Sequence, residues 1–224
     1  MAKVRVYVDA FNVYYGALKN RGAGTKWLDL RALVGTALRS HSVDRVVYCT
    51  ARVSDPQTNA KQDRYLRALA ARGGVDIVEG TYKMREKSGT IVSPPPPPGY
   101  PPGNPGRVRI RAPEEKGSDV NLASRLLIDA YEGRFDEAIV MSLDTDLAMP
   151  ISHVTHHLKK AVGLLVNADR ANAAGVRVST LVAVELRKAA KYCRRYTEVQ
   201  VRASQLPDPV IGPGGAVIAK PVGW

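Results

Sequence analysis

Five short apolar runs recur along the chain, and segments with helical spacing separate them. The runs are rich in β-branched residues and cover residues 4–10, 45–53, 75–80, 137–144 and 161–167. Their nearly continuous apolar character is typical of strands covered on both faces. Residues 28–39, 60–71, 119–131 and 147–158 have the spacing of amphipathic helices. This alternation predicts parallel pairing through right-handed crossovers, so we expect an α/β fold of three layers, α/β/α, with a mostly parallel central sheet of about five strands.

One segment, at about residues 81–112, interrupts the alternation. Residues 93–106 contain eight prolines, which excludes a helix or an inner strand and predicts a loop. On either side, basic residues alternate with apolar or aromatic ones, so the cations of each flank share one face. The first flank holds Lys83, Arg85 and Lys87, and the second holds Arg107, Arg109 and Arg111. We interpret the segment as a basic hairpin with the proline loop at its tip. It is either a nucleic-acid clamp or a solvated flap whose cations keep an edge strand from aggregating.

The pattern weakens after residue 167. Residues 179–196 have the spacing of a helix with basic residues toward its end. From residue 205 onward the chain is rich in proline and glycine, which predicts an extended tail along the body. We therefore expect one domain over residues 1–200, which includes the basic hairpin, and an extended tail over residues 201–224.

The charge balance adds an expected partner. The 224 residues include 33 Lys and Arg against 21 Asp and Glu, a formal net charge of +12, so the average surface attracts nucleic acid. A basic composition alone is also compatible with a protein that binds no polymer.

The two cysteines, Cys49 and Cys193, are too few for a disulfide framework and favour a reducing compartment. Without a membrane-length apolar run or a signal peptide, we expect a cytoplasmic protein with no membrane contact.

Acidic residues stand at the carboxyl ends of two predicted strands. Asp9 leaves the first strand and is followed by Asn12, while Asp144 and Asp146 stand in the turn after the fourth strand. Binding sites of open α/β sheets lie outside these strand ends. Each residue also has a structural explanation, because Asp and Asn favour helix N-caps and turns. Capping explains one aspartate of the later turn more easily than it explains two.

Asp119 supplies a third carboxylate position. Ser118 has the character of an N-cap, so Asp119 falls in the first helical turn, where the apolar spacing directs it toward the buried stripe. A first-turn aspartate also suits the helix dipole, which requires no function. Four carboxylates at one end of a sheet repel each other unless a cation lies between them, and oxygen ligands favour a hard ion. The sequence therefore predicts Mg²⁺ or Mn²⁺ held by Asp9, Asp119, Asp144 and Asp146, a site suited to phosphodiester hydrolysis.

Three segments, in order, resemble a known family. They are "YVDAFNVYYG", "EKGSDVNLASRLLIDA" and "DEAIVMSLDTDLAMPI", and they are similar to the NYN domain, a branch of the PIN-like nucleases related in fold to the flap endonuclease core. The resemblance covers roughly residues 3–195, and the last residues look like the tails of bacterial members. It implies a PIN-like fold and a metal-dependent endoribonuclease acting on RNA, with the same four aspartates as metal ligands.

The resemblance also assigns roles to single residues. It implies that Asn12 positions a ligand or the phosphate and that Lys116 contacts the scissile phosphate. The chain departs from the family where Leu143 replaces a glycine, which predicts a wider turn and a displaced Asp144. The alternative function is a nucleic-acid-binding regulatory module of the same fold that does not cleave. No glycine-rich phosphate loop follows the first strand, which argues against a nucleotide-binding fold. The sequence leaves the oligomeric state open, with a homodimer as one option.

Overall fold

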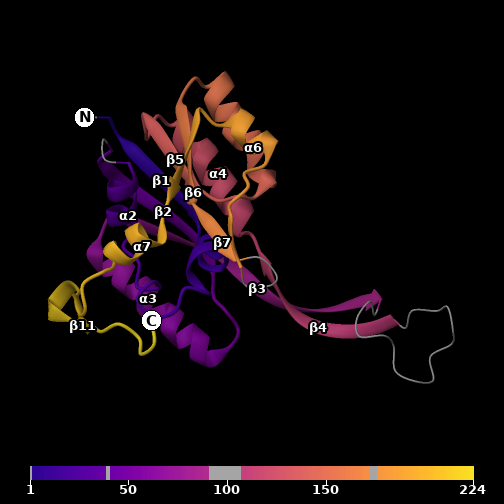
Figure 1. Ribbon diagram of the computed structural model, residues 1–224, viewed down its shortest axis with the longest axis vertical. Coiled ribbons are helices and arrows are strands. Elements are labelled where there is room, and N and C mark those ends of the chain that lie inside the picture. The colour runs from indigo at the N-terminus through magenta and orange to yellow at the C-terminus, as the bar shows by residue number, and fades with distance from the viewer. Residues whose placement is uncertain (1, 39–40, 91–106, 172–175) are drawn as a thin grey trace.

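A seven-stranded sheet divides the molecule into layers in the computed structural model, which describes residues 2–38, 41–90, 107–171 and 176–224 (Figure 1). The strands lie in the order β4-β3-β2-β1-β5-β6-β9, and all neighbours are parallel except β3 and β4. Their bounds are β1 Val4–Asp9, β2 Val43–Ala51, β3 Val75–Thr90, β4 Arg107–Lys116, β5 Glu137–Met141, β6 Ala161–Asn167 and β9 Tyr192–Tyr196. The α/β expectation is confirmed: all five predicted strands belong to this sheet, which β4 and β9 extend at its two edges.

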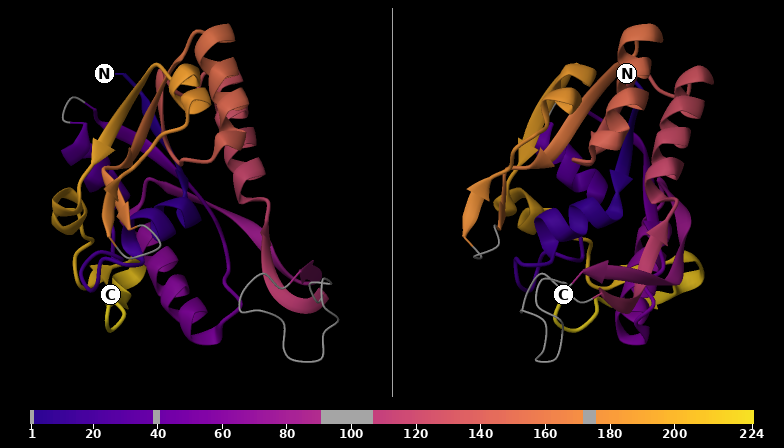
Figure 2. Two further views of the ribbon diagram at one scale, coloured as in Figure 1. Left: turned by 45° about the vertical axis from the view of Figure 1, so that its right-hand side comes forward. Right: turned by 90° about the vertical axis from the view of Figure 1, so that its right-hand side faces the viewer.

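Helices cover both faces of the sheet (Figure 2). One face is covered by α1 Ala10–Val13, its continuation η1 Tyr14–Leu18, α2 Leu30–Ala37, α3 Pro56–Arg72 and α7 Glu198–Ala203. The other is covered by α4 Ser118–Tyr131, η2 Thr145–Leu147, α5 Ala148–Ser152, η3 His153–His157 and α6 Val184–Ala189. Each face of the sheet has its own hydrophobic core, and successive side chains of β1 point to opposite faces. Val6 and Val8 belong to the first core, on the α1 side, and Tyr7 belongs to the second, on the α4 side.

A buried acid ties α4 to the sheet. Asp129 has no exposed surface, and its Oδ2 accepts hydrogen bonds from Tyr7 Oη and Arg5 Nη1, both at 2.8 Å. Its Oδ1 accepts a third from Arg134 Nη1 at 3.2 Å. These bonds compensate for the burial of a charge. They also fix the helix whose first turn carries Asp119.

The predicted basic flanks form a two-stranded arm, defined here as residues 81–90 of β3 and 107–116 of β4 (Figure 1). The strands pair antiparallel from Thr81 with Lys116 to Thr90 with Arg107, and the arm extends away from the body of the molecule. The residues that connect them, with the predicted proline loop at 93–106, lie outside the described residues. Along the chain, the arm lies between the first part of β3, which pairs in parallel with β2, and the helix α4.

The prediction of one helix over residues 179–196 is wrong. The segment divides into α6 and the edge strand β9, which pairs with β6 in parallel. Tyr196 is buried in the first core, and Tyr192 Oη donates to Glu137 Oε1 at 2.6 Å. Pairing with an open sheet edge, the burial of Tyr196 and the partial burial of Tyr192 outweigh the local helical spacing.

The last residues pack onto the first core. They include the short strands β10 Val210–Ile211 and β11 Val217–Ile218 and the turn η4 Pro213–Gly215, and a second small ribbon joins β7 Asp169–Ala171 to β8 Arg177–Ser179. Trp27 Nε1 donates to the Pro207 carbonyl at 3.0 Å, and the Trp224 ring contacts Trp27 and Tyr65.

In the described parts of the chain, no helix has the length and apolar character that crossing a membrane requires.

Candidate active site: an acidic cleft at the strand ends

Asp9 lies at the carboxyl end of β1, the central strand of the sheet, and is only 5% exposed. Its Oδ1 accepts a hydrogen bond from the Asn12 N–H at 2.9 Å, which begins α1, and its Oδ2 accepts one from Ser142 Oγ at 2.9 Å. Burial raises the pKa of Asp9, the two hydrogen bonds oppose that shift, and the charge of Asp144 adds to it. The residue is therefore both a helix cap and a wall of the site.

The turn after β5 holds two more predicted carboxylates. Asp144 is half-buried and caps η2, because its Oδ1 accepts a hydrogen bond from the Asp146 N–H at 3.0 Å. The Leu143 N–H donates to Asn12 Oδ1 at 3.2 Å, which joins this turn to the end of β1. Leu143 packs beside the second core, and Asp144 still lines the same cleft as Asp9. Asp146 is exposed and does not line the cleft.

Asp119 reaches the same place from the first turn of α4. The expectation that Ser118 caps this helix is wrong, because Gly117 occupies the N-cap with a left-handed φ of 97°. Glu115 Oε1 accepts a hydrogen bond from the Ser118 N–H at 2.9 Å and so satisfies one of the N–H groups that lack a partner within the helix. Gly80 of β3 lies against this junction, where a Cβ would stand 2.6 Å from the Lys116 carbonyl oxygen. The close approach of β3 to the start of α4 therefore requires a glycine.

These residues meet in one open cleft of about 410 Å³, which is lined by Asp9, Phe11, Asn12, Tyr15, Tyr82, Glu115, Asp119 and Asp144. Asp119 forms no hydrogen bond with any described residue. Burial raises its pKa to about 6, and the charges of Asp9 and Asp144 contribute to the same shift. The sequence prediction that acids from distant segments converge thus agrees with the geometry for Asp9, Asp119 and Asp144.

The cleft offers acceptors that suit a divalent cation. Both oxygens of Asp119 and Oδ2 of Asp144 lack a hydrogen-bond partner among the described residues, and a cation would relieve the repulsion that raises the pKa of Asp119. Within the described ranges, no group of three or more His, Cys, Asp or Glu side chains is arranged to hold an ion by itself. The donors present fit a hard ion that binds carboxylates and keeps water ligands, as Mg²⁺ does.

Two polar residues at the cleft, Ser142 and Glu115, escape the sequence analysis. Ser142 is buried and connects two acidic residues, since its Oγ donates to Asp9 and accepts from the Asp144 N–H at 3.1 Å. Glu115 and Tyr82 are paired across the arm at its base. The available signal for Glu115 is its place in "EEKGSD", four residues before Asp119. For Ser142 it is the position directly after the buried strand.

The two faces of the arm differ in their relation to the cleft. Neighbouring residues of a strand face opposite sides, and directly paired residues share a side. Glu115 and Tyr82 line the cleft, and the same face of β4 carries Arg111, Arg109 and Arg107 farther along the arm. Arg109 pairs with Glu86, while the other two arginines form no ion pair with a described residue. We call this the cleft face of the arm.

The opposite face carries the remaining predicted cations. Arg85, Lys87 and Lys116 share one acid, Glu114, at 3.3, 3.3 and 3.0 Å. These ion pairs lower the pKa of Glu114, with the Lys116 hydrogen bond as the largest cause. The side chain of Lys83 is outside the described part of the structure. Lys116 is exposed and does not line the cleft.

Comparison with known proteins places this fold. The family model of the NYN domain matches residues 3–194. A 6-hydroxy-3-succinoylpyridine 3-monooxygenase, HspA, of Pseudomonas putida is 28% identical over 246 aligned residues, which cover 99% of this chain and 75% of the relative. The crystal structure of a protein of unknown function from Vibrio parahaemolyticus superposes with a TM-score of 0.52 at 17% identity, covering 86% of this chain and 91% of the other, and so shares the fold. Since the family match spans nearly the whole chain, the protein belongs to the NYN domain family, whose fold is nuclease-like.

Proposed function

We propose that this protein is a metal-dependent endoribonuclease that hydrolyses phosphodiester bonds in RNA. The observation that carries the proposal is the meeting of Asp9, Asp119 and Asp144, from β1, α4 and the turn after β5, in one cleft. The nuclease-like family supports a nucleic-acid substrate, and the net charge of +12 favours binding of a polyanion.

Each cleft residue has a role in this proposal. In this proposal Asp9, Asp119 and Asp144 would hold Mg²⁺ or Mn²⁺ together with water ligands, and the ion would lower the pKa of a water molecule and neutralise charge on the leaving oxygen. Asn12 is oriented by the Leu143 N–H, which donates to its Oδ1. Its Nδ2 has no partner among the described residues, so it is free to donate a hydrogen bond to a phosphate oxygen.

Two further residues act from outside the lining. Asp146 is exposed and its charge contributes to the raised pKa of Asp119; in this proposal it joins the ligand set through a water molecule. Lys116 leaves its ion pair with Glu114 when it contacts the phosphate next to the cleft. An exposed ion pair of this kind stabilises little, about 1 kcal/mol or less, and exchanges readily.

In this proposal the cleft face of the arm binds the RNA strand. Arg107, Arg109 and Arg111 continue the surface that begins at Tyr82 and Glu115. Arginine binds phosphate oxygens through paired donors, and Tyr82 at the base is available for stacking on a nucleotide base. In the same proposal Lys83, Arg85 and Lys87 contact RNA from the opposite face, as a clamp.

The decisive test is cleavage of an end-labelled single-stranded RNA in Mg²⁺, in Mn²⁺ and in EDTA. We expect internal products with either metal and none in EDTA, and we expect Asp9→Asn to lower the rate at least about 100-fold. Asn at this position retains an acceptor for the Asn12 N–H and a donor toward Ser142, so the fold is preserved. Asp44→Asn is the control, because Asp44 is an exposed acid with one ion pair of 4.0 Å. Wild-type protein without products in either metal would overturn the proposal.

The same assay addresses a non-cleaving nucleic-acid-binding module of this fold. The basic arm supports that alternative independently of the acids. A retarded RNA band that forms with and without metal, together with uncut RNA after long incubation, would establish it in place of the nuclease.

An action on a small aromatic compound is a second candidate. The relative HspA is by its name a monooxygenase of a pyridine, and a pocket with aromatic walls adjoins the acidic cleft in this chain. Incubation with hydroxypyridines in the presence of dioxygen and a reduced nicotinamide as electron donor, in parallel with incubation with RNA, separates this candidate from the nuclease, because each predicts a different product.

A further inference from the structure

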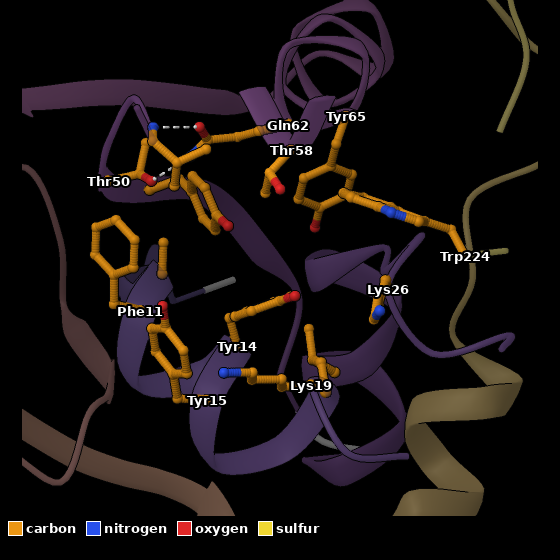
Figure 3. A pocket seen from close by; sticks show the side chains of 14 residues that line it. Phe11, Tyr14, Tyr15, Lys19, Lys26, Thr50, Thr58, Gln62, Tyr65 and Trp224 are labelled. Atoms are coloured by element: carbon orange, nitrogen blue, oxygen red, sulfur yellow. Dashed lines mark hydrogen bonds between the residues drawn. The ribbon is translucent and has the colours of Figure 1, made fainter. Parts of the chain in front are cut away.

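A second pocket lies beside the acidic cleft, and its lining has the opposite character (Figure 3). Its volume is about 280 Å³, and it shares Phe11 and Tyr15 with the cleft. None of its described lining residues is acidic, and six of the fourteen are aromatic. A volume at the lower end of ligand pockets, which span roughly 300–1,000 Å³, suits one substituted ring system.

Aromatic side chains form two walls of this pocket. Phe11 and Tyr15 stack with ring centroids 6.3 Å apart and an interplanar angle of 22°. Figure 3 shows Phe11, Tyr14 and Tyr15 across from Tyr65 and Trp224, whose ring centroids lie 5.8 Å apart. Flat faces on two sides favour a flat occupant, because stacking on aromatic rings requires planarity.

Polar groups without partners also reach into the pocket. The hydroxyls of Tyr14 and Tyr48 form no hydrogen bond with a described residue, and Lys26 forms no ion pair with one. Lys19 Nζ lies 4.8 Å from the centroid of the Tyr15 ring, again without an acidic partner in the described parts of the chain. An apolar occupant would cover these donors and leave them unsatisfied, whereas an occupant with acceptors and a negative charge would pair with them.

We propose that this pocket binds a planar nitrogen heterocycle that carries an anionic group. The ring stacks between the two aromatic walls, its heteroatoms accept hydrogen bonds from Tyr14 and Tyr48, and the anion lies at Lys19 and Lys26. Two sources present this chemistry: a nucleotide unit of an RNA strand that runs on into the cleft, and a free heteroaromatic acid. Phe11 and Tyr15 belong to both cavities, so either ligand has its ring next to the carboxylates. The proposal does not require the cleft to cleave RNA.

Calorimetric titration of the full chain in EDTA tests the pocket without any cleavage readout. The ring-and-anion probes are uridine 5′-monophosphate, pyridine-3-carboxylate and a trinucleotide RNA, and the half-probes are uridine and ribose 5-phosphate. We expect at least one complete probe to bind about 10-fold more tightly than either half-probe, because each half leaves one set of pocket groups unpaired. A response to the trinucleotide alone identifies a strand as the source, and a response to the small acids identifies a free ligand.

Variants assign the binding to this pocket. Lys26→Met is expected to weaken a complete probe about 10-fold and to leave uridine unaffected, because it removes only the charge that meets the anion. Lys61→Met, on the exposed surface of α3 outside the pocket, is the matched control and should change neither. Tyr14→Phe, which keeps the wall and removes one hydroxyl, should weaken every ring probe. Absence of binding by all complete probes, equal affinity for ribose 5-phosphate, or an unchanged affinity in Lys26→Met would overturn the proposal and leave the nuclease proposal standing.

Discussion

The acidic cleft and the basic arm concentrate opposite charges by different structural means. In the cleft, hydrogen bonds between segments far apart in the sequence fix the acids, as between Ser142 and Asp9 or between Leu143 and Asn12. On the arm, the cations stand on two exposed strands, and the ion pairs of Arg85 and Arg109 are made to acids of the arm itself. The cleft is part of the packed body, whereas the arm extends away from it (Figure 1).

This difference predicts how each region tolerates change. Chemistry at a phosphodiester requires groups placed within about 0.5 Å, so the cleft depends on its supporting hydrogen bonds. Attraction of a polyanion requires charge on the correct face and little positional accuracy. One isosteric substitution of a cleft acid should therefore abolish RNA cleavage. RNA binding by the arm should instead depend on how many cations it carries and on which face they lie.

The largest effect is expected from Asp119→Asn. This acid forms no hydrogen bond with a described residue, so its replacement removes charge and leaves the network around Asp9 intact. We expect RNA cleavage to fall about 100- to 1,000-fold. In metal-free buffer the variant should melt at a higher temperature than the wild type, because burial and neighbouring acids disfavour the charge of Asp119.

The pH dependence of that difference provides the internal control. The pKa of Asp119 is about 6 in the folded protein against an ordinary 3.8, so the folded state binds this proton more tightly than the unfolded state. The wild type should therefore lose stability relative to Asp119→Asn as the pH rises from about 4 to about 6, and the gap should stay constant above that range. Mg²⁺ should narrow the gap by stabilising the charged acid. A gap that is the same at every pH would contradict the proposed electrostatic environment.

Gly80→Ala should produce the next largest effect, and it acts on the cleft without replacing a cleft residue. The added Cβ would stand 2.6 Å from the Lys116 carbonyl oxygen and 3.1 Å from Glu115 Oε1, so the start of α4 must shift. We expect a loss of about 1–3 kcal/mol in the free energy of unfolding from overpacking. Cleavage should fall about 10- to 100-fold, because Asp119 moves with the helix.

Gly89→Ala is the matched control for that experiment. It lies on the same strand, but on the arm, where a Cβ would meet nothing within 4 Å. Stability and cleavage should remain close to those of the wild type. Equal losses in both variants would mean that β3 is sensitive to alanine in general, and the close packing at Gly80 would not explain the effect.

The same contrast explains how far the sequence predicts this molecule. The runs at 4–10 and 161–167 are strands because inner parallel strands are apolar on both faces, a signal that is local. Asp9 and Asp144 follow such strands, so their convergence can be predicted from topology alone. Asp119 could be placed because the helical spacing directs it toward the interior.

Residues whose role depends on a neighbour in space were not predictable. Tyr192–Tyr196 has helical spacing and becomes a strand because β6 offers an open edge. Glu115 enters the cleft because Gly80 lets β3 approach the start of α4, and that contact has no pattern along the chain. The alternation of the arm predicts that each flank has one basic face, but the pairing register decides which face continues into the cleft.

The smallest predicted effect is a difference in RNA binding between variants of the two faces of the arm. Replacing Arg107, Arg109 and Arg111 by Gln should weaken single-stranded RNA binding roughly 10-fold in EDTA and lower the slope of log affinity against log salt by about 2, as expected when three phosphate contacts are lost. The comparison variant removes the same number of charges from the opposite face, at Arg85, Lys87 and Lys116, whose shared partner Glu114 already neutralises part of their charge. Its slope should fall by less than half as much, because these cations already share an acidic partner, which Arg107 and Arg111 lack among the described residues. If the slope of log affinity against log salt falls equally in both triple variants, RNA binding depends on the total charge of the arm. The arm would then not direct the RNA strand toward the acids.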